Sequence, residues 1–361
     1  MGQKAPYPKL KPLLPSIDEV ETRKTLKAAN RAISKVAELK GMANLIPNQQ
    51  ILINALTLKE SKDSSEIENI ITSEDELYKA IHAKEFNPTP QSKEVVNYRT
   101  ALIKGSDLIK ERGFLSVNNI IEIQSLIVGH NAGIKSTPGT VLKIEKTGEV
   151  VYTPPQDKME IEKLLSNFIK YFNQDGNAQI DPLILMAILH FQFESIHPFY
   201  DGIGRTDRIL NVLHLMLNNL LDIPVLYLSS NIIKSKAEYY ILLNDINKTH
   251  NWENWILYML DVVEKTAGQT IDQINEIVLL LNTTIEEVKL KANKIYRKEL
   301  VEALFEHPYS KIDYIVTSLD IERKVASRYL KKLEEIGILK SQKIGRETVY
   351  VNLGLMEVLR K

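Results

Sequence analysis

The chain contains no cysteine. This absence excludes disulfides and thiolate metal sites, and it favours a reducing compartment such as the cytoplasm. Basic and acidic residues number 46 each, so the formal net charge is zero and no overall field attracts nucleic acid or anionic lipid. No apolar run is long enough to span a bilayer, and the first residues lack the apolar segment of a signal peptide. We therefore expect a cytoplasmic location and no membrane partner.

With 361 residues, the chain has room for two or three domains. Prolines at 6, 8, 12 and 15 predict an extended arm. Ser16 and Glu19 fit a capping box that opens a helix reaching Leu39. Helical periodicity then dominates and predicts a mainly α fold, with further helices at 48–61, 64–71, 73–85, 91–112 and 116–128.

One string of twelve residues, from His197 to Arg208, reads His-Pro-Phe-Tyr-Asp-Gly-Ile-Gly-Arg-Thr-Asp-Arg. Histidine is a candidate base, and Asp201 is a hard oxygen ligand suited to Mg²⁺. Glycines allow close approach of the backbone to an anion, and two arginines at i and i+3 share a helix face. A plain turn between two core helices needs neither the aspartate nor the arginines. The combination indicates a site for a nucleoside triphosphate.

The string resembles the Fic family motif HPFx(D/E)GNGRxxR. It departs from that motif at Ile203, where the family usually has asparagine, and Asp207 stands where glycine is common. The resemblance implies a helical bundle that transfers AMP from ATP to a Ser, Thr or Tyr hydroxyl of a protein. It implies His197 as the catalytic base, Asp201 as the Mg²⁺ ligand, and a phosphate site formed by Gly202, Ile203, Gly204, Arg205 and Arg208.

Aromatic residues at helical spacing are usually core residues, and we expect core packing for Trp252 and Trp255. Fic proteins, however, carry a similar Tyr-Tyr pair close to the nucleotide. By this resemblance we expect Tyr239 or Tyr240, together with Asn247, to border the adenosine.

Two β-branched and aromatic runs, at 140–144 and 150–152, flank Lys146-Thr147-Gly148-Glu149 and predict a hairpin. An isolated hairpin is marginal unless it packs or binds something. The segment resembles the Fic flap, which implies that residues 137–152 hold a protein target, either another protein or the chain itself. A surface hairpin without a partner is the alternative.

Ser64, Glu68 and Asn69 match the inhibitory pattern (S/T)xxxE(G/N) of many Fic proteins. The resemblance implies that Glu68 pairs with Arg208 and blocks the γ-phosphate site. A solvated helix face is the ordinary alternative.

Apolar positions from Ile271 to Ile295 alternate at spacings of three and four, which is the pattern of a coiled-coil seam. Such a helix packs either on the catalytic core or on a second chain in a homodimer. The predicted organisation is therefore an arm and inhibitory region at 1–90, a Fic catalytic core at 91–265, a connecting helix at 266–297 and a C-terminal domain at 298–361.

The tail combines a three-helix pattern with an alternating strand at 348–351 and resembles a winged helix-turn-helix. The predicted recognition helix carries Arg323, Lys324, Arg328, Lys331 and Lys332, and the wing carries Lys343 and Arg346. Twelve basic and ten acidic residues from Lys298 onward leave DNA and protein both open as partners.

Two alternatives to AMP transfer also fit the motif. One is a DNA-binding regulator that senses a nucleotide without catalysis. The other is the same fold with a different nucleotide or a phosphocholine donor.

Overall fold

The computed structural model of the chain describes residues 10–13, 15–46, 48–82, 86–131, 133–143, 150–173 and 180–360. Two compact units emerge: residues 1–37 with 97–267, and residues 38–96 with 268–361. Three helices contribute residues to both units, namely α2 (Arg23–Asn44), α5 (Pro90–Arg112) and α12 (Trp252–Lys291).

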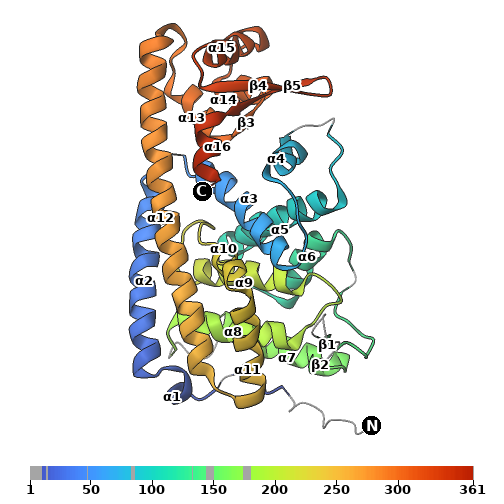
Figure 1. Cartoon of the computed structure of the whole chain (residues 1–361). Coiled ribbons are helices and arrows are strands. Elements are labelled where there is room, and N and C mark those ends of the chain that lie inside the picture. The colour runs from blue at the N-terminus through green and yellow to red at the C-terminus, as the bar shows by residue number, and fades with distance from the viewer. Residues whose placement is uncertain are drawn as a thin grey trace. The chain divides into compact units, whose positions relative to one another are not determined.

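The first unit is mainly helical and is built around two consecutive helices, α8 (Pro182–Ile196) and α9 (Ile203–Leu217) (Figure 1). Nearly every residue of both helices is buried, so they form the centre of this unit. The helices around them are α6 (Val117–Val128), α7 (Lys158–Phe172), α10 (Ser229–Lys234) and α11 (Lys236–Thr249).

The start of α8 follows directly from its sequence. The Asp181 carboxylate accepts hydrogen bonds from the amides of Leu183 and Ile184, and Pro182 occupies the first helical position. Both features favour a helix start, because proline lacks the amide that would otherwise need an acceptor.

The predicted hairpin is present as two short antiparallel strands, β1 (Leu142–Lys143) and β2 (Val150–Tyr152), with Leu142 opposite Tyr152. The Tyr152 hydroxyl donates to the Ser195 carbonyl at 2.9 Å and so ties β2 to α8. The turn predicted at 146–149 lies outside the described residues.

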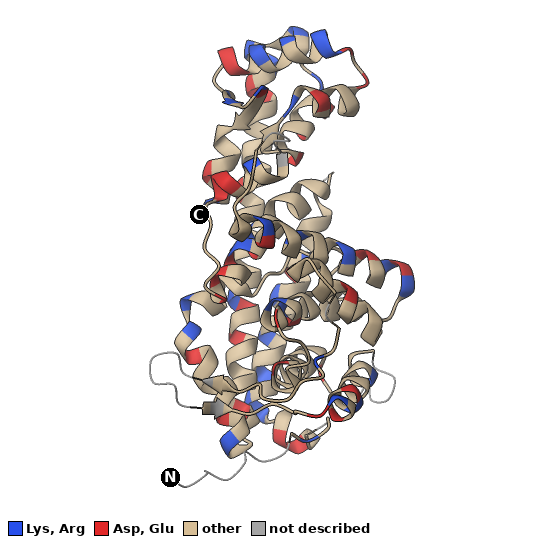
Figure 2. Cartoon of the chain, turned by 90° about the vertical axis from the view of Figure 1, so that its right-hand side faces the viewer, with Lys and Arg blue, Asp and Glu red and all other residues tan. Residues whose placement is uncertain are grey.

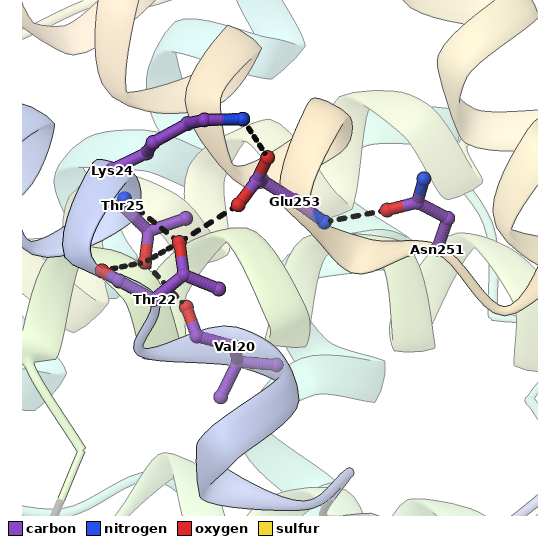
Figure 3. A network of polar contacts seen from close by, with 6 residues as sticks. All are labelled: Val20, Thr22, Lys24, Thr25, Asn251 and Glu253. Carbon is purple, nitrogen blue, oxygen red and sulfur yellow. Dashed lines mark hydrogen bonds and ion pairs between the residues drawn. The ribbon is translucent and has the colours of Figure 1, made fainter.

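The helix predicted from Ser16 to Leu39 is wrong in one respect, because it is two helices. Helix α1 (Ile17–Val20) ends after four residues, and the Ser16 side chain makes no capping bond. The Thr25 hydroxyl donates to the Val20 carbonyl at 2.7 Å and satisfies the end of α1, while the Thr22 hydroxyl bonds the Glu253 carboxylate at 2.9 Å (Figure 3). These hydrogen bonds stabilise the interruption between α1 and α2, which the local sequence pattern did not predict.

Part of the predicted arm, residues 10–13, lies on the helices of the first unit. The Leu13 amide donates to the Asn167 side chain at 2.7 Å, and the Gln192 side chain donates to the Lys11 carbonyl at 3.0 Å. Side chains of α7 and α8 thus satisfy a proline-containing backbone that has no regular structure of its own.

After the end of α2, the second unit continues with α3 (Gln50–Ile67) and α4 (Glu74–His82). Helix α3 joins two segments that we predicted as separate helices, and it ends four residues before the predicted Ile71. The end falls where Asn69 adopts a left-handed conformation with φ of 62°, which asparagine tolerates better than most residues.

The remainder of the second unit follows α12 and the short 3₁₀ helix η1 (Asn293–Ile295). The three predicted helices are present as α13 (Lys298–Glu306), α14 (Ile312–Leu319) and α15 (Arg323–Glu335), and the predicted strand at 348–351 lies within β5 (Glu347–Asn352). Strands β3 (Tyr309–Ser310) and β4 (Leu339–Ile344) and helix α16 (Leu353–Leu359) were not predicted from the sequence. The three strands form an antiparallel sheet in the order β3-β5-β4.

Most positions of the predicted coiled-coil seam are buried within the single chain, among them Ile274, Leu281 and Val288. The seam therefore does not require a second chain to cover it. No helix among the described residues is long and apolar enough to cross a membrane.

Candidate active site

The twelve-residue motif forms the turn between α8 and α9. Helix α8 ends at His197, which is left-handed with φ of 48°, and its amide donates to the Phe193 carbonyl at 3.1 Å. Helix α9 begins after Gly202, which is also left-handed with φ of 76°. A Cβ at Gly202 would lie 2.9 Å from Val128 Cγ1, so both the backbone conformation and the available space require glycine there.

Asp201 presents its carboxylate at the N-terminal end of α9. Its Oδ1 accepts a hydrogen bond from the Gly202 amide at 2.6 Å and lies 3.5 Å from Arg205 Nη2. The Asp201 side chain is 68% exposed, so its second oxygen is accessible to a ligand. A single carboxylate that shares Mg²⁺ with phosphate oxygens is a common protein arrangement, and Asp201 fits it.

Ile203 and Gly204 occupy the first turn of α9, where backbone amides have no acceptor within the helix. The positive end of the helix dipole adds to their attraction for an anion. Arg205 and Arg208, on the same helix, are only 2% and 3% exposed. The structure thus brings together the five residues predicted to bind phosphate in one turn of backbone and the helix that follows it.

Behind the motif lies a buried polar cluster that the sequence analysis missed. His190 Nε2 lies 2.7 Å from the Tyr239 hydroxyl, and His190 Nδ1 lies 2.7 Å from the Asn211 amide nitrogen and 3.1 Å from Asp207 Oδ2. Glu194, four residues after His190 on α8, adds a negative charge beside Asp207.

Burial decides the protonation of this cluster. Burial and, to a smaller extent, the Arg208 charge lower the pKa of His190 to about 3, so the imidazole is neutral. Burial also raises the pKa of Asp207 well above its usual value, and the charge of Glu194 adds to that shift.

His190, Glu194 and Asp207 each offer one possible metal ligand, and these atoms lie within 4.8 Å of one another. The guanidinium of Arg208 already supplies positive charge to the same cluster and disfavours a cation there. In the sequence, the spacing of His190 and Glu194 on one helix was a local signal for this cluster.

The two predicted adenosine tyrosines differ in environment. Tyr239 is 1% exposed, and its ring packs against His190, Trp255 and Tyr258. Tyr240 is 43% exposed and packs edge-on against Tyr239, on the same helix as half-buried Asn247. Of the pair, only Tyr240 has the exposure that contact with a ligand requires, while Tyr239 supports the core.

The backbone of the catalytic turn is held from α6. The Gln124 side chain, 2% exposed, donates to the Asp201 carbonyl at 2.9 Å. Helix α6 therefore both fills the space against Gly202 and fixes the carbonyl that precedes it.

The three residues of the inhibitory pattern lie in the second unit at the C-terminal end of α3. Ser64 is fully buried, whereas Glu68 and Asn69 are exposed residues at the helix end. The Glu68 amide donates to the Ser65 carbonyl at 3.0 Å, which fixes the backbone from which the carboxylate projects.

A cavity of about 470 Å³ in the first unit lies between α10, α11 and α12. Its lining includes Lys234, Glu238, Tyr258 and Lys265 and none of the motif residues. The cavity is therefore separate from the turn between α8 and α9 that carries the motif.

Comparison with known protein families gives a match for three regions of the chain. Residues 114–215 match the Fic/DOC family, residues 26–107 match the Fic/DOC family N-terminal domain, and residues 280–355 match the C-terminal domain of SoFic-like protein adenylyltransferases. The chain belongs to the Fic/DOC family.

Among curated proteins, the chain is similar to protein adenylyltransferase fic-1 of Caenorhabditis elegans. The two are 30% identical over 158 residues, which is 43% of this chain and 29% of the relative. Protein adenylyltransferase Fic of Drosophila melanogaster is 24% identical over 179 residues, which is 48% of this chain and 34% of the relative. The chain thus matches about a third of the length of these relatives.

Solved structures share the fold. A Fic family protein from Desulfovibrio desulfuricans superposes with a TM-score of 0.55 at 16% identity, over 96% of this chain and 98% of that chain. A Fic-domain protein from Bacteroides thetaiotaomicron gives a TM-score of 0.56 at 18% identity, over 69% of this chain and 97% of that chain. These likenesses confirm the predicted mainly helical Fic fold.

Proposed function

We propose that the chain is a protein adenylyltransferase that moves AMP from ATP to a Ser, Thr or Tyr hydroxyl of a protein. The observation that carries this proposal is the turn from His197 to Arg208. It combines a base, an exposed carboxylate, the amide-rich start of α9 and two buried arginines. The adenylyltransferase names of the curated relatives support the same reaction.

In the proposed reaction, the target hydroxyl oxygen attacks the α-phosphorus of ATP. A new oxygen–phosphorus bond forms, the bond from the α-phosphorus to the bridging oxygen breaks, and pyrophosphate leaves with that electron pair. The His197 imidazole takes the hydroxyl proton. First-turn amides of α9 and the Arg205 guanidinium stabilise charge on the phosphates.

Asp201 would hold Mg²⁺ against the phosphates, where the metal neutralises charge. Its exposed carboxylate, fixed by the Gly202 amide, supports this assignment. Ile203, where the family usually has asparagine, offers only its backbone amide to a phosphate. We therefore propose weakened but retained ATP binding at this site.

We further propose that Glu68 restrains the activity by pairing with Arg208. The support is the sequence pattern at Ser64, Glu68 and Asn69 together with the exposed position of Glu68 at the end of α3. Pairing would occupy the guanidinium needed for the γ-phosphate and place negative charge where the triphosphate lies. The protein would then be nearly inactive until Glu68 is displaced.

Incubation with Mg-ATP followed by intact-mass spectrometry tests the reaction. The expected product is protein that carries one added AMP, on the chain itself or on a supplied acceptor, together with pyrophosphate. A different added group would assign the fold to another donor, such as phosphocholine. Absence of any product from both the parent and the Glu68→Gly protein would refute the proposed activity.

A second candidate function is duplex DNA binding through α15. Lys324, Arg328 and Lys331 are exposed and fall at i, i+4 and i+7, so they form one basic stripe opposite the buried face of the helix. Figure 2 marks the Lys and Arg positions of the chain in blue on the backbone. Exposed Lys343 on β4 adds a further positive charge near the hairpin turn. A basic stripe on the second helix of a helix-turn-helix suits DNA phosphates.

Fluorescence anisotropy with a labelled duplex at increasing salt tests this candidate. Replacing the three stripe residues with glutamine should reduce the slope of log affinity against log salt by about 3. If the full chain shows no salt-dependent duplex binding, α15 is instead a surface for protein contact.

A further inference from the structure

Tyr200 is the variable residue of the motif, and its side chain is 51% exposed. A tyrosine kept mainly for core packing would be buried. Its hydroxyl instead meets three groups of the segment that leads into the hairpin. The amides of Ser136 and Thr137 donate to it at 3.0 Å and 3.1 Å, and the Thr137 hydroxyl lies 2.6 Å away.

A fourth bond joins the same two segments. The Lys135 amide donates to the Pro198 carbonyl at 2.9 Å. Pro198 directly follows His197, whose left-handed conformation sets the direction of the imidazole. Residues 135–137 are thus bonded to the catalytic turn on both sides of Phe199.

The segment is also fixed at its other end. The Gln156 side chain accepts from the Gly139 amide at 2.6 Å and donates to the Thr140 carbonyl at 3.0 Å. It donates in addition to the Pro154 carbonyl at 2.6 Å, just after β2. Two side chains therefore hold residues 136–140, just before β1: Tyr200 from the catalytic turn and Gln156 from the far side of the hairpin.

We propose that Tyr200 is a positioning residue that sets the hairpin at a fixed distance from His197, so that a protein hydroxyl bound along the hairpin meets the base. This inference rests on the proposed AMP transfer. Water that attacks ATP needs no alignment by the hairpin, whereas a protein hydroxyl does. Tyr200 therefore favours transfer to protein over hydrolysis of ATP to AMP and pyrophosphate.

The test replaces Tyr200 with phenylalanine, which keeps the ring and removes only the hydroxyl. Amide hydrogen exchange reports the segment directly. Loss of the acceptor should accelerate exchange at Ser136 and Thr137 by about fivefold, which corresponds to roughly 1 kcal/mol for each lost hydrogen bond. Thr137→Val removes the side-chain contact alone and should have a smaller effect, and Tyr171→Phe on α7 is the matched control without effect.

The functional readout is measured in the Glu68→Gly background with radiolabelled ATP, with the protein itself and a bacterial extract as acceptors. Tyr200→Phe should lower AMP incorporation into protein by about tenfold, while ATP hydrolysis changes less than twofold. A parallel fall in both rates would show that Tyr200 acts on the base or the nucleotide, and unchanged amide exchange would show that no positioning contact exists. Either result overturns the inference.

Failure of the proposed function gives a different pattern. If the Glu68→Gly protein makes neither labelled protein nor AMP, the adenylyltransferase assignment fails and the positioning role for that reaction fails with it. Exchange at Ser136 and Thr137 then still decides whether Tyr200 holds the segment.

Discussion

The side-chain amide of Gln124 donates a 2.9 Å hydrogen bond to the backbone carbonyl of Asp201, in the turn that joins α8 to α9. This contact connects α6 to the residue proposed to hold Mg²⁺. Gln124 is 2% exposed, whereas Asp201 is an exposed residue, so the bond is partly buried.

We predict that Gln124→Met reduces AMP transfer more than it reduces stability. Methionine fills a similar volume but removes the donor to the Asp201 carbonyl, and a hydrogen bond of this kind contributes about 0.5–1.5 kcal/mol. The rate of transfer should fall by roughly one order of magnitude. Steady-state kinetics beside a thermal melt measure both quantities, and an unchanged rate would show that the turn keeps its position without α6.

His197 requires a variant that respects its backbone. Alanine is strained at a φ of 48°, whereas asparagine adopts the left-handed region more readily. Both His197→Ala and His197→Asn should abolish AMP transfer because neither supplies a base. The asparagine variant should melt at a temperature close to that of the parent. Transfer at the parental rate by the asparagine variant would refute the role of His197.

We predict that removing the Glu68 carboxylate relieves the proposed inhibition and activates AMP transfer. Glu68→Gln keeps the size of the side chain and removes its charge, and Glu68→Gly removes the whole group. Each should raise AMP transfer at least about tenfold, since a charge-assisted pair contributes roughly 1.5–3 kcal/mol. Glu74→Gln, at the start of α4, is the charge-matched control. If no Glu68 variant exceeds the parent while ATP still binds, the end of α3 is ordinary scaffold.

Ile203 provides a test of nucleotide affinity. Ile203→Asn restores the residue usual in the family and adds an amide that can bond a phosphate. We expect Mg-ATP binding by the Glu68→Gly protein, and about fivefold tighter binding after the additional Ile203→Asn change. Ile203 is 7% exposed, so the same change should lower the melting temperature. Calorimetry that detects no binding to either protein would contradict the nucleotide site.

Acid should destabilise the first unit through two buried histidines. Burial lowers the pKa of His190 to about 3 and that of His214 to about 4, both well below the 6.5 of an unfolded chain. The unfolded state therefore binds more protons than the folded state as the pH falls from 6.5 towards 4. Each histidine then costs about 1.4 kcal/mol of unfolding free energy per pH unit.

Urea unfolding at several pH values measures this slope. His214→Gln retains a donor for the Pro182 carbonyl, which His214 now contacts at 2.9 Å, and should remove about half of the histidine contribution. Equal acid sensitivity in the parent and the variant would show that His214 is not the titrating group.

The sequence alone determined the fold class, the motif, and three helices and one strand of the C-terminal region. These features depend on local signals, namely helical periodicity, β-branched runs and glycines at turns. Each of these signals can be recognised within a short stretch of the sequence. The need for glycine at position 202 is likewise inherent in a turn that approaches an anion, and the structure shows the left-handed φ there.

Only the tertiary structure decided which residues support the motif. Gln124 on α6 bonds the Asp201 carbonyl, and His190 on α8 meets Asp207 on α9. Each pair comes from two different helices that packing brings together, so no local spacing marks it. Burial separated Tyr239 from Tyr240, although adjacent residues of one pattern look alike in the sequence. The break between α1 and α2 depends on Glu253, which is 231 residues away from Thr22 and invisible to any local rule.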